Sequence, residues 1–238
     1  MRPSLRHAGF AAVFVVWATL LAAVARTGFD LFGEHPLSYL GTEPRSAVLF
    51  TAGLAVSALL LIGFHHYLRA RFVVSAGFSL AMLAGLAGQL VAAFVPIGGD
   101  PDLHRVHTIS ALALGASLPL LMWRFAAGQP PGPWRRLSYA WFWAEVAACA
   151  VGLYLSARSI APVAEIVPGA VFHAWVVTVT LVASTAVEKS ASRAHRVLCP
   201  LPACARAQTG RHRGFKLAMV SGSDCGAEPA RSHARPAR

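Results

Sequence analysis

The sequence predicts an all-α fold: a polytopic membrane protein built as a bundle of six transmembrane helices. Two observations predict it. Hydrophobic residues make up 56% of the chain and charged residues only 13%, which lies outside the usual range of soluble domains. In addition, apolar runs of about 20 residues, the length that crosses roughly 30 Å of hydrocarbon as a helix, recur six times.

The six spans are placed between breaks that contain Pro, Gly and charged residues. We expect them at about residues 8–25, 46–64, 72–95, 106–123, 137–157 and 170–187. From residue 188 the chain becomes basic and loses any sustained helical or strand period. Residues 188–238 are therefore predicted to form a disordered cytoplasmic tail.

The first span admits a second interpretation. Arg2 and Arg6 precede it, and it ends in the small-residue segment Ala23-Val24-Ala25, which resembles a signal-peptidase site. Cleavage there would leave five spans. Retention as a membrane anchor is the interpretation that the length of the run favours, and the alternative stays open.

The charge of the chain predicts orientation and excludes one class of partner. The formal net charge is +11, but basic residues do not alternate with aromatic ones, so a nucleic-acid partner is not expected. Of the 21 Lys and Arg residues, 17 fall on one side of the predicted spans and 4 on the other. Because basic residues are retained in the cytoplasm, we expect both termini there. The expected location is the plasma membrane. The expected partners are membrane lipids, and the sequence specifies no protein partner.

The outward side collects residues that can bind or catalyse. Asp30 and Asp100 belong to a group of acidic residues on that side, together with His104, His107 and His173. His104 and His107 share a helical face and, with His173, form an alternative zinc site. Capping and hydrogen bonding are the favoured roles, with Asp102 as cap of the fourth helix, so no cofactor is predicted.

Glu145 is the one clear carboxylate inside a predicted span, at a depth of roughly 12 Å. A charge at that depth is costly, so the side chain should be protonated, paired or in contact with a wet cavity.

Two short motifs carry a resemblance to a known family. One is residues 35–41 (HPLSYLG), followed by Pro44-Arg45 and a span that contains Phe50 and Gly53. The other is Phe94-Val95-Pro96, then Asp100 and His107. Together they resemble the bacterial family called domain of unknown function 998 and, more distantly, the eukaryotic FGF-receptor-activating protein, DRAM and Sfk family.

The resemblance covers about residues 8–187 and implies six helices in a plasma membrane or endomembrane. It implies no established reaction, and the distant relatives point toward lipids. Ser38, Asp100 and His107 are the positions that match polar residues of the motifs.

Three functions follow from these observations. The favoured one is a non-catalytic or lipid-interacting protein whose outer rim engages lipid or a partner. The second is a metal-dependent hydrolase of a lipid-like substrate that uses the three histidines with Asp30 or Asp100. The third is a proton-coupled transporter that uses Glu145. The polar rim is predicted to contain Asp30, Ser38, Asp100, His104, His107 and His173.

The orientation can be tested with reporter fusions. A reporter fused after Val187 should be active only in the cytoplasm, and one inserted near Gly99 only outside, because the basic residues are so unevenly distributed. A C-terminus outside the cell would contradict the six-span topology.

Overall fold

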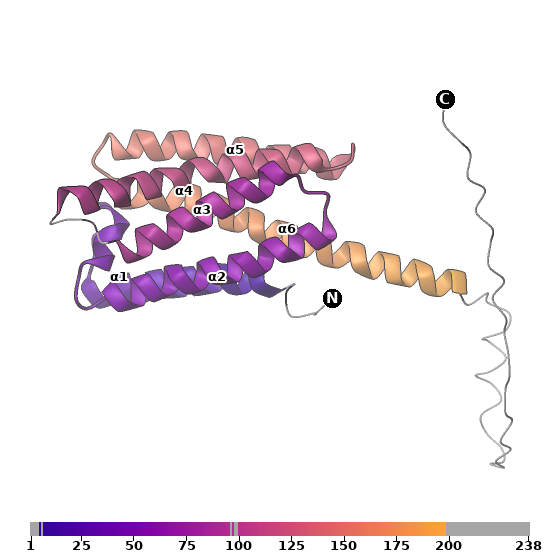
Figure 1. Ribbon diagram of the computed structural model, residues 1–238, viewed down its shortest axis with the longest axis horizontal. Helices are drawn as coiled ribbons and strands as arrows, with labels where there is room; N and C mark the ends of the chain where they lie inside the picture. Colours follow the sequence, from indigo (N-terminus) through magenta and orange to yellow (C-terminus); the bar gives the residue numbers. More distant parts are fainter. Residues whose placement is uncertain (1–4, 6, 96, 98–99, 199–238) are drawn as a thin grey trace, which may run out of the picture. The chain divides into compact units, whose positions relative to one another are not determined.

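The computed structural model describes residues 5, 7–95, 97 and 100–198, with side chains described as far as Val182. Within this part of the chain all regular structure is helical, as predicted (Figure 1). The elements are α1 (Ala8–Thr27), the short 3₁₀ helix η2 (Leu37–Gly41), α2 (Ala47–Arg71), α3 (Ala76–Phe94), α4 (Pro101–Gly128), α5 (Pro133–Ser156) and α6 (Ala161–Leu198).

Successive helices run antiparallel, so the bundle has two distinct ends (Figure 1). At the end that we call the first-loop end, α1, α3 and α5 finish and α2, α4 and α6 begin. At the opposite, N-terminal end, α1, α3 and α5 begin. Contacts confirm the direction of packing, because Gly63 late in α2 lies against Ala8 at the start of α1, and Gly77 at the start of α3 lies against Arg124 late in α4.

Five helical segments are long and apolar enough to cross a membrane: α1, α2, α3, α4 and residues 161–182 of α6. α5 is long enough to cross a membrane, but Glu145 and the Trp and Tyr residues of this helix lower its mean hydropathy. Its surface still exposes large apolar side chains such as Trp143 and Leu153, which a lipid environment would cover. The chain is thus a multi-pass helical membrane protein.

Several helices are longer than the sequence predicted. α2 continues to Arg71, α4 begins at Pro101 rather than near residue 106, and α6 begins at Ala161 rather than near residue 170. Charged residues marked the edge of the apolar run, yet a helix can continue beyond it. Pro162 sits in the first turn of α6, where a missing N–H costs nothing, and Pro168 is accommodated inside the helix.

Two predictions about helix ends need correction. The N-cap of α4 is Asp100, whose Oδ1 accepts a hydrogen bond from the Asp102 N–H at 2.8 Å, so Asp102 is not the cap as predicted. Pro101 takes the first helical position, which displaces Asp102 into the first turn. At the C-terminal end α6 continues to Leu198 rather than ending near residue 187. The remainder of the predicted tail, residues 199–238, lies outside the described residues.

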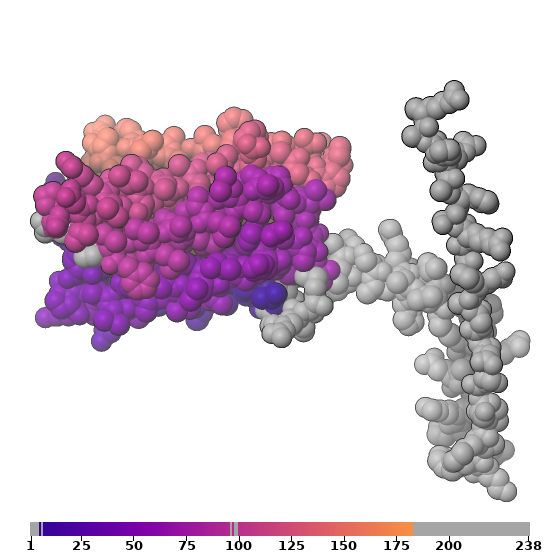
Figure 2. All heavy atoms as spheres, in the orientation of Figure 1, coloured from indigo at the N-terminus to yellow at the C-terminus, as the bar shows by residue number. Residues whose placement is uncertain are grey.

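Aromatic side chains fill the N-terminal end of the bundle. Trp175 of α6 is fully buried and packs edge to face against Phe64 of α2 and Phe125 of α4, with ring centroids 6.3 and 5.5 Å apart. Phe125 also meets Phe78 of α3 and Trp134 of α5. These five rings join five helices. The gaps between the helix ribbons in Figure 1 are filled by side chains on the face that Figure 2 shows.

α3 and α4 approach closely because α3 has glycine, which lacks a side chain, at two positions of their interface. A Cβ atom at Gly88 would lie 2.6 Å from the backbone oxygen of Ser110, and one at Gly85 would overlap Ser117 Oγ. Small residues allow such approach where lipid offers no hydrophobic drive for helix association.

Gly88→Ala should therefore lower the stability of the bundle by about 1–3 kcal/mol, because α4 backbone cannot move aside as a side chain could. Gly115→Ala is the matched control, since a Cβ there meets nothing within 4 Å. It should gain about 0.5–1 kcal/mol from helix propensity alone. Thermal unfolding in detergent measures both, and equal effects at the two positions would disprove the close approach.

Candidate functional site

The first loop folds back onto the bundle. Leu37 and Leu40 of η2 are buried with Ala23 of α1, and Phe50 of α2 packs against them. Ser46 is also buried, and its hydroxyl donates to the Leu40 carbonyl at 2.8 Å. The loop is thus held by both apolar packing and hydrogen bonds.

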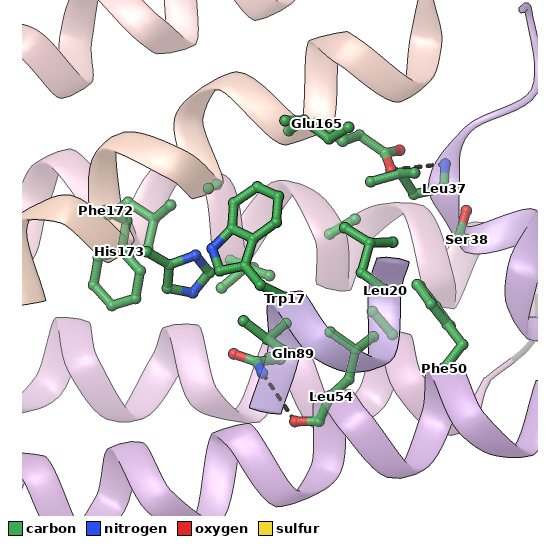
Figure 3. A pocket seen from close by; sticks show the side chains of 18 of the residues that line it. Trp17, Leu20, Leu37, Ser38, Phe50, Leu54, Gln89, Glu165, Phe172 and His173 are labelled. Atoms are coloured by element: carbon green, nitrogen blue, oxygen red, sulfur yellow. Dashed lines mark hydrogen bonds between the residues drawn. The ribbon is translucent and has the colours of Figure 1, made fainter. Parts of the chain in front are cut away.

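Below this loop lies a cavity of about 310 Å³ (Figure 3). Its walls come from five helices and η2. The lining residues are Val16, Trp17, Thr19 and Leu20 of α1; Leu37 and Ser38 of η2; Phe50 and Leu54 of α2; Gln89 and Ala92 of α3; His107, Ala111, Leu114, Gly115 and Leu118 of α4; and Glu165, Ile166, Gly169, Phe172 and His173 of α6.

The cavity exists because small residues occupy the helix faces that surround it. Ala92, Ala111, Gly115 and Gly169 all line it. A Cβ atom built at Gly115 or Gly169 would meet nothing within 4 Å, so both glycines border open space. Neither one is explained by close helix packing.

Glu165 connects the first loop to α6. Its Oε2 accepts a hydrogen bond from the Leu37 backbone N–H at 3.0 Å, across 128 positions of sequence (Figure 3). The side chain keeps an exposed surface, and among the described residues no partner is found for Oε1. The carboxyl group therefore holds the loop with one oxygen and leaves the other available.

Gln89 and His107 each donate to a backbone carbonyl. Gln89 Nε2 donates to the Leu54 carbonyl at 2.9 Å, so its amide oxygen remains as an acceptor (Figure 3). His107 Nδ1 lies 2.7 Å from the Val95 carbonyl. A carbonyl can only accept, so Nδ1 carries the proton, and in the neutral ring Nε2 is left with a free lone pair.

His173 and Ser38 contribute two further polar groups to the wall. The His173 ring stands edge to face against Trp17, with centroids 5.9 Å apart, and its Nδ1 is buried without a hydrogen-bond partner in the described structure. Ser38 follows Leu37 in η2, and its hydroxyl has no partner among the described residues.

The predicted rim is only partly brought together. Ser38, His107 and His173 line the cavity, whereas Asp30, Asp100 and His104 do not. Asp30 and Asp100 are exposed and accept from nearby backbone N–H groups, those of Phe32 and Asp102. His104 is exposed on the first turn of α4.

Of the three histidines of the alternative zinc site, His107 and His173 line the cavity, whereas His104 is exposed and does not. In the described part of the chain, no three His, Cys, Asp or Glu side chains are grouped so that they could hold a metal ion.

Glu145 lies outside the cavity. It is fully buried on α5, and the Cys149 thiol is 3.8 Å from its Oε1. Its Oε2 has no partner among the described residues. Among the described residues, this carboxyl group therefore has no cationic partner, and it does not line the cavity.

Sequence reasoning did not select Trp17, Gln89 or Glu165 for the site. Glu165 was assigned to a loop, yet once residues 161–169 are helical it shares a face with Gly169 and His173 at a spacing of four. That spacing was a usable signal. Trp17 gave none, because it is a single aromatic residue within an apolar run.

Comparison with known proteins places this fold in a family. The model of the family described as "Protein of unknown function (DUF998)" matches residues 9–182, which include every residue of the cavity wall. The chain belongs to this family. Neither a curated protein nor a solved structure matches the chain. The DUF998 match confirms the resemblance in the two motifs, and the more distant eukaryotic similarity stays an expectation.

His107→Phe tests the hydrogen bond that orients the His107 ring. The change keeps the ring volume but leaves the Val95 carbonyl without its donor, so stability should fall by about 1–3 kcal/mol. His104→Phe is the control, since His104 is exposed on the same helix, and it should change thermal stability little. Similar losses in both variants would show that the Val95 contact does not stabilise the fold.

Proposed function

We propose that this DUF998 protein binds a lipid-like amphiphile in the first-loop cavity, as a non-catalytic protein of the cell membrane. The single observation that supports this most is a preformed cavity with mostly apolar walls and a few polar groups, among them Ser38, Gln89, His107 and Glu165. Apolar cavities with a small number of placed polar groups are typical ligand sites.

The volume limits what can enter. At roughly 30 Å³ for a group the size of water, 310 Å³ holds about ten such groups. A methylene group is similar in size, so the cavity suits a single aliphatic chain of about ten carbons. A complete two-chain phospholipid is too large, although one of its chains could enter.

The distribution of charge supports an orientation with the cavity on the outer side. Arg69, Arg71, Arg124, Arg135 and Arg136 lie near the N-terminal end of the bundle, where no described side chain is acidic. Basic residues are retained in the cytoplasm, so both chain termini belong there and the first-loop end faces outward.

Photolabelling can test binding. The probe is a ten-carbon alcohol with a diazirine in its chain, added to the protein in zwitterionic nanodiscs. Wild-type protein should be labelled on cavity-lining peptides of α1, α4 and α6. The double variant Gly115→Leu, Gly169→Leu should lose most of this labelling, because both added side chains have open space to enter.

The matched control is Ala113→Leu, Ala174→Leu, which adds the same side chains to exposed positions of the same two helices. It should be labelled like wild type. Unchanged labelling in the glycine variant, or labelling confined to outward faces of the bundle, would disprove the proposal.

A further inference from the structure

Two polar side chains on the cavity wall use a donor within the protein. The Gln89 amide and the His107 ring each donate to a backbone carbonyl. The acceptors that remain without a partner in the described structure are the Gln89 oxygen, the lone pair of His107 Nε2 and the second oxygen of Glu165. The His173 ring and the Ser38 hydroxyl are also unpaired, and each can donate or accept. The cavity therefore presents several unpaired acceptors to which a ligand can donate.

The charge of the wall has one sign. Of the described residues that line the cavity, none is Lys or Arg, and Glu165 is the acidic one. At the first-loop end, acidic residues outnumber basic ones. The six acidic residues are Asp30, Glu34, Glu43, Asp100, Asp102 and Glu165, and the four basic residues are Arg26, Arg45, Arg105 and Arg158. Arg105 pairs with Asp102 at 3.6 Å. A cation is attracted to such a surface and an anion is not.

On the basis of the proposed function, we propose that the cavity prefers a single-chain amphiphile with a primary ammonium group, held beside Glu165. An ammonium group has three N–H donors and accepts none, so it complements the unpaired oxygens of Gln89 and Glu165 and the His107 lone pair. An ammonium group beside Glu165 favours the ionised form of the carboxyl group, whose free oxygen then supplies the opposite charge while the other oxygen stays bonded to Leu37. Ser38, next to Leu37 in η2, adds a hydroxyl acceptor on the same side of the cavity (Figure 3).

An anionic head group finds no cation on the described wall and would face Glu165 directly. An alcohol can donate one hydrogen bond but gains nothing from the charge. The expected order of affinity is therefore amine, then alcohol, then carboxylate.

Binding of decylamine, decanol and decanoate to the protein in zwitterionic nanodiscs tests this order. All three share one chain, and at pH 7 the amine is protonated and the acid ionised. Nanodiscs that carry the Gly115→Leu, Gly169→Leu variant measure partition into lipid, which is subtracted. Decylamine should bind more tightly than decanol by several-fold and more tightly than decanoate by about tenfold or more.

Glu165→Gln should remove the preference for the amine over the alcohol and leave decanol binding nearly unchanged. The glutamine oxygen can still accept from the Leu37 N–H, so the loop contact is kept. Glu43→Gln is the control, because Glu43 is an exposed acid of the first loop that does not line the cavity. This variant should keep the wild-type order.

The outcomes separate the two proposals. Decanol or decanoate binding as tightly as decylamine would overturn the amine preference and leave the ligand cavity in place. The same holds if Glu165→Gln keeps the wild-type order. If none of the three binds more to wild type than to the glycine variant, the proposed function fails, and the amine preference fails with it.

Discussion

Edge-to-face packing of aromatic rings at the N-terminal end is the interaction on which the rest of the structure depends. Trp175 contacts rings from α2 and α4, so α6 is fixed between elements that are distant in sequence. Gly9 of α1 lets Val176 and Thr180 of α6 approach closely. Because lipid gives helices no hydrophobic reason to associate, shape complementarity must hold them. With the helices fixed at this end, small residues at the other end can leave a cavity open.

The polar residues that join helices also determine the chemistry of the cavity. Gln89 joins α3 to α2, and His107 joins α4 to the end of α3, each by donating to a backbone carbonyl. Thr51 joins α2 to α3 in the same way. A polar side chain in an apolar environment needs such a partner. Where the side chain has both a donor and an acceptor, use of the donor leaves the acceptor for a ligand.

Glu165 has an equivalent double role at the surface. The backbone of a loop at a membrane surface needs hydrogen-bond partners, and Glu165 supplies one to Leu37 while it borders the cavity. Glu145 differs, because it lies buried on α5 away from the cavity, with the Cys149 thiol beside it. Of the two carboxyl groups, Glu165 is the one in a position to meet a ligand.

The sequence by itself determined the membrane class, the all-helical fold and the family, because apolar runs of bilayer length and short local motifs are properties of contiguous residues. It also identified Ser38, His107 and His173, which line the cavity, but grouped them with Asp30, Asp100 and His104, which bind only their own local backbone or face outward. Only the tertiary structure decided which side chains share the cavity and that Trp17, Gln89 and Glu165 belong to it. The physical reason is that a cavity forms where several helices present small residues at the same depth, and that depth depends on how the helices pack, which local sequence does not specify.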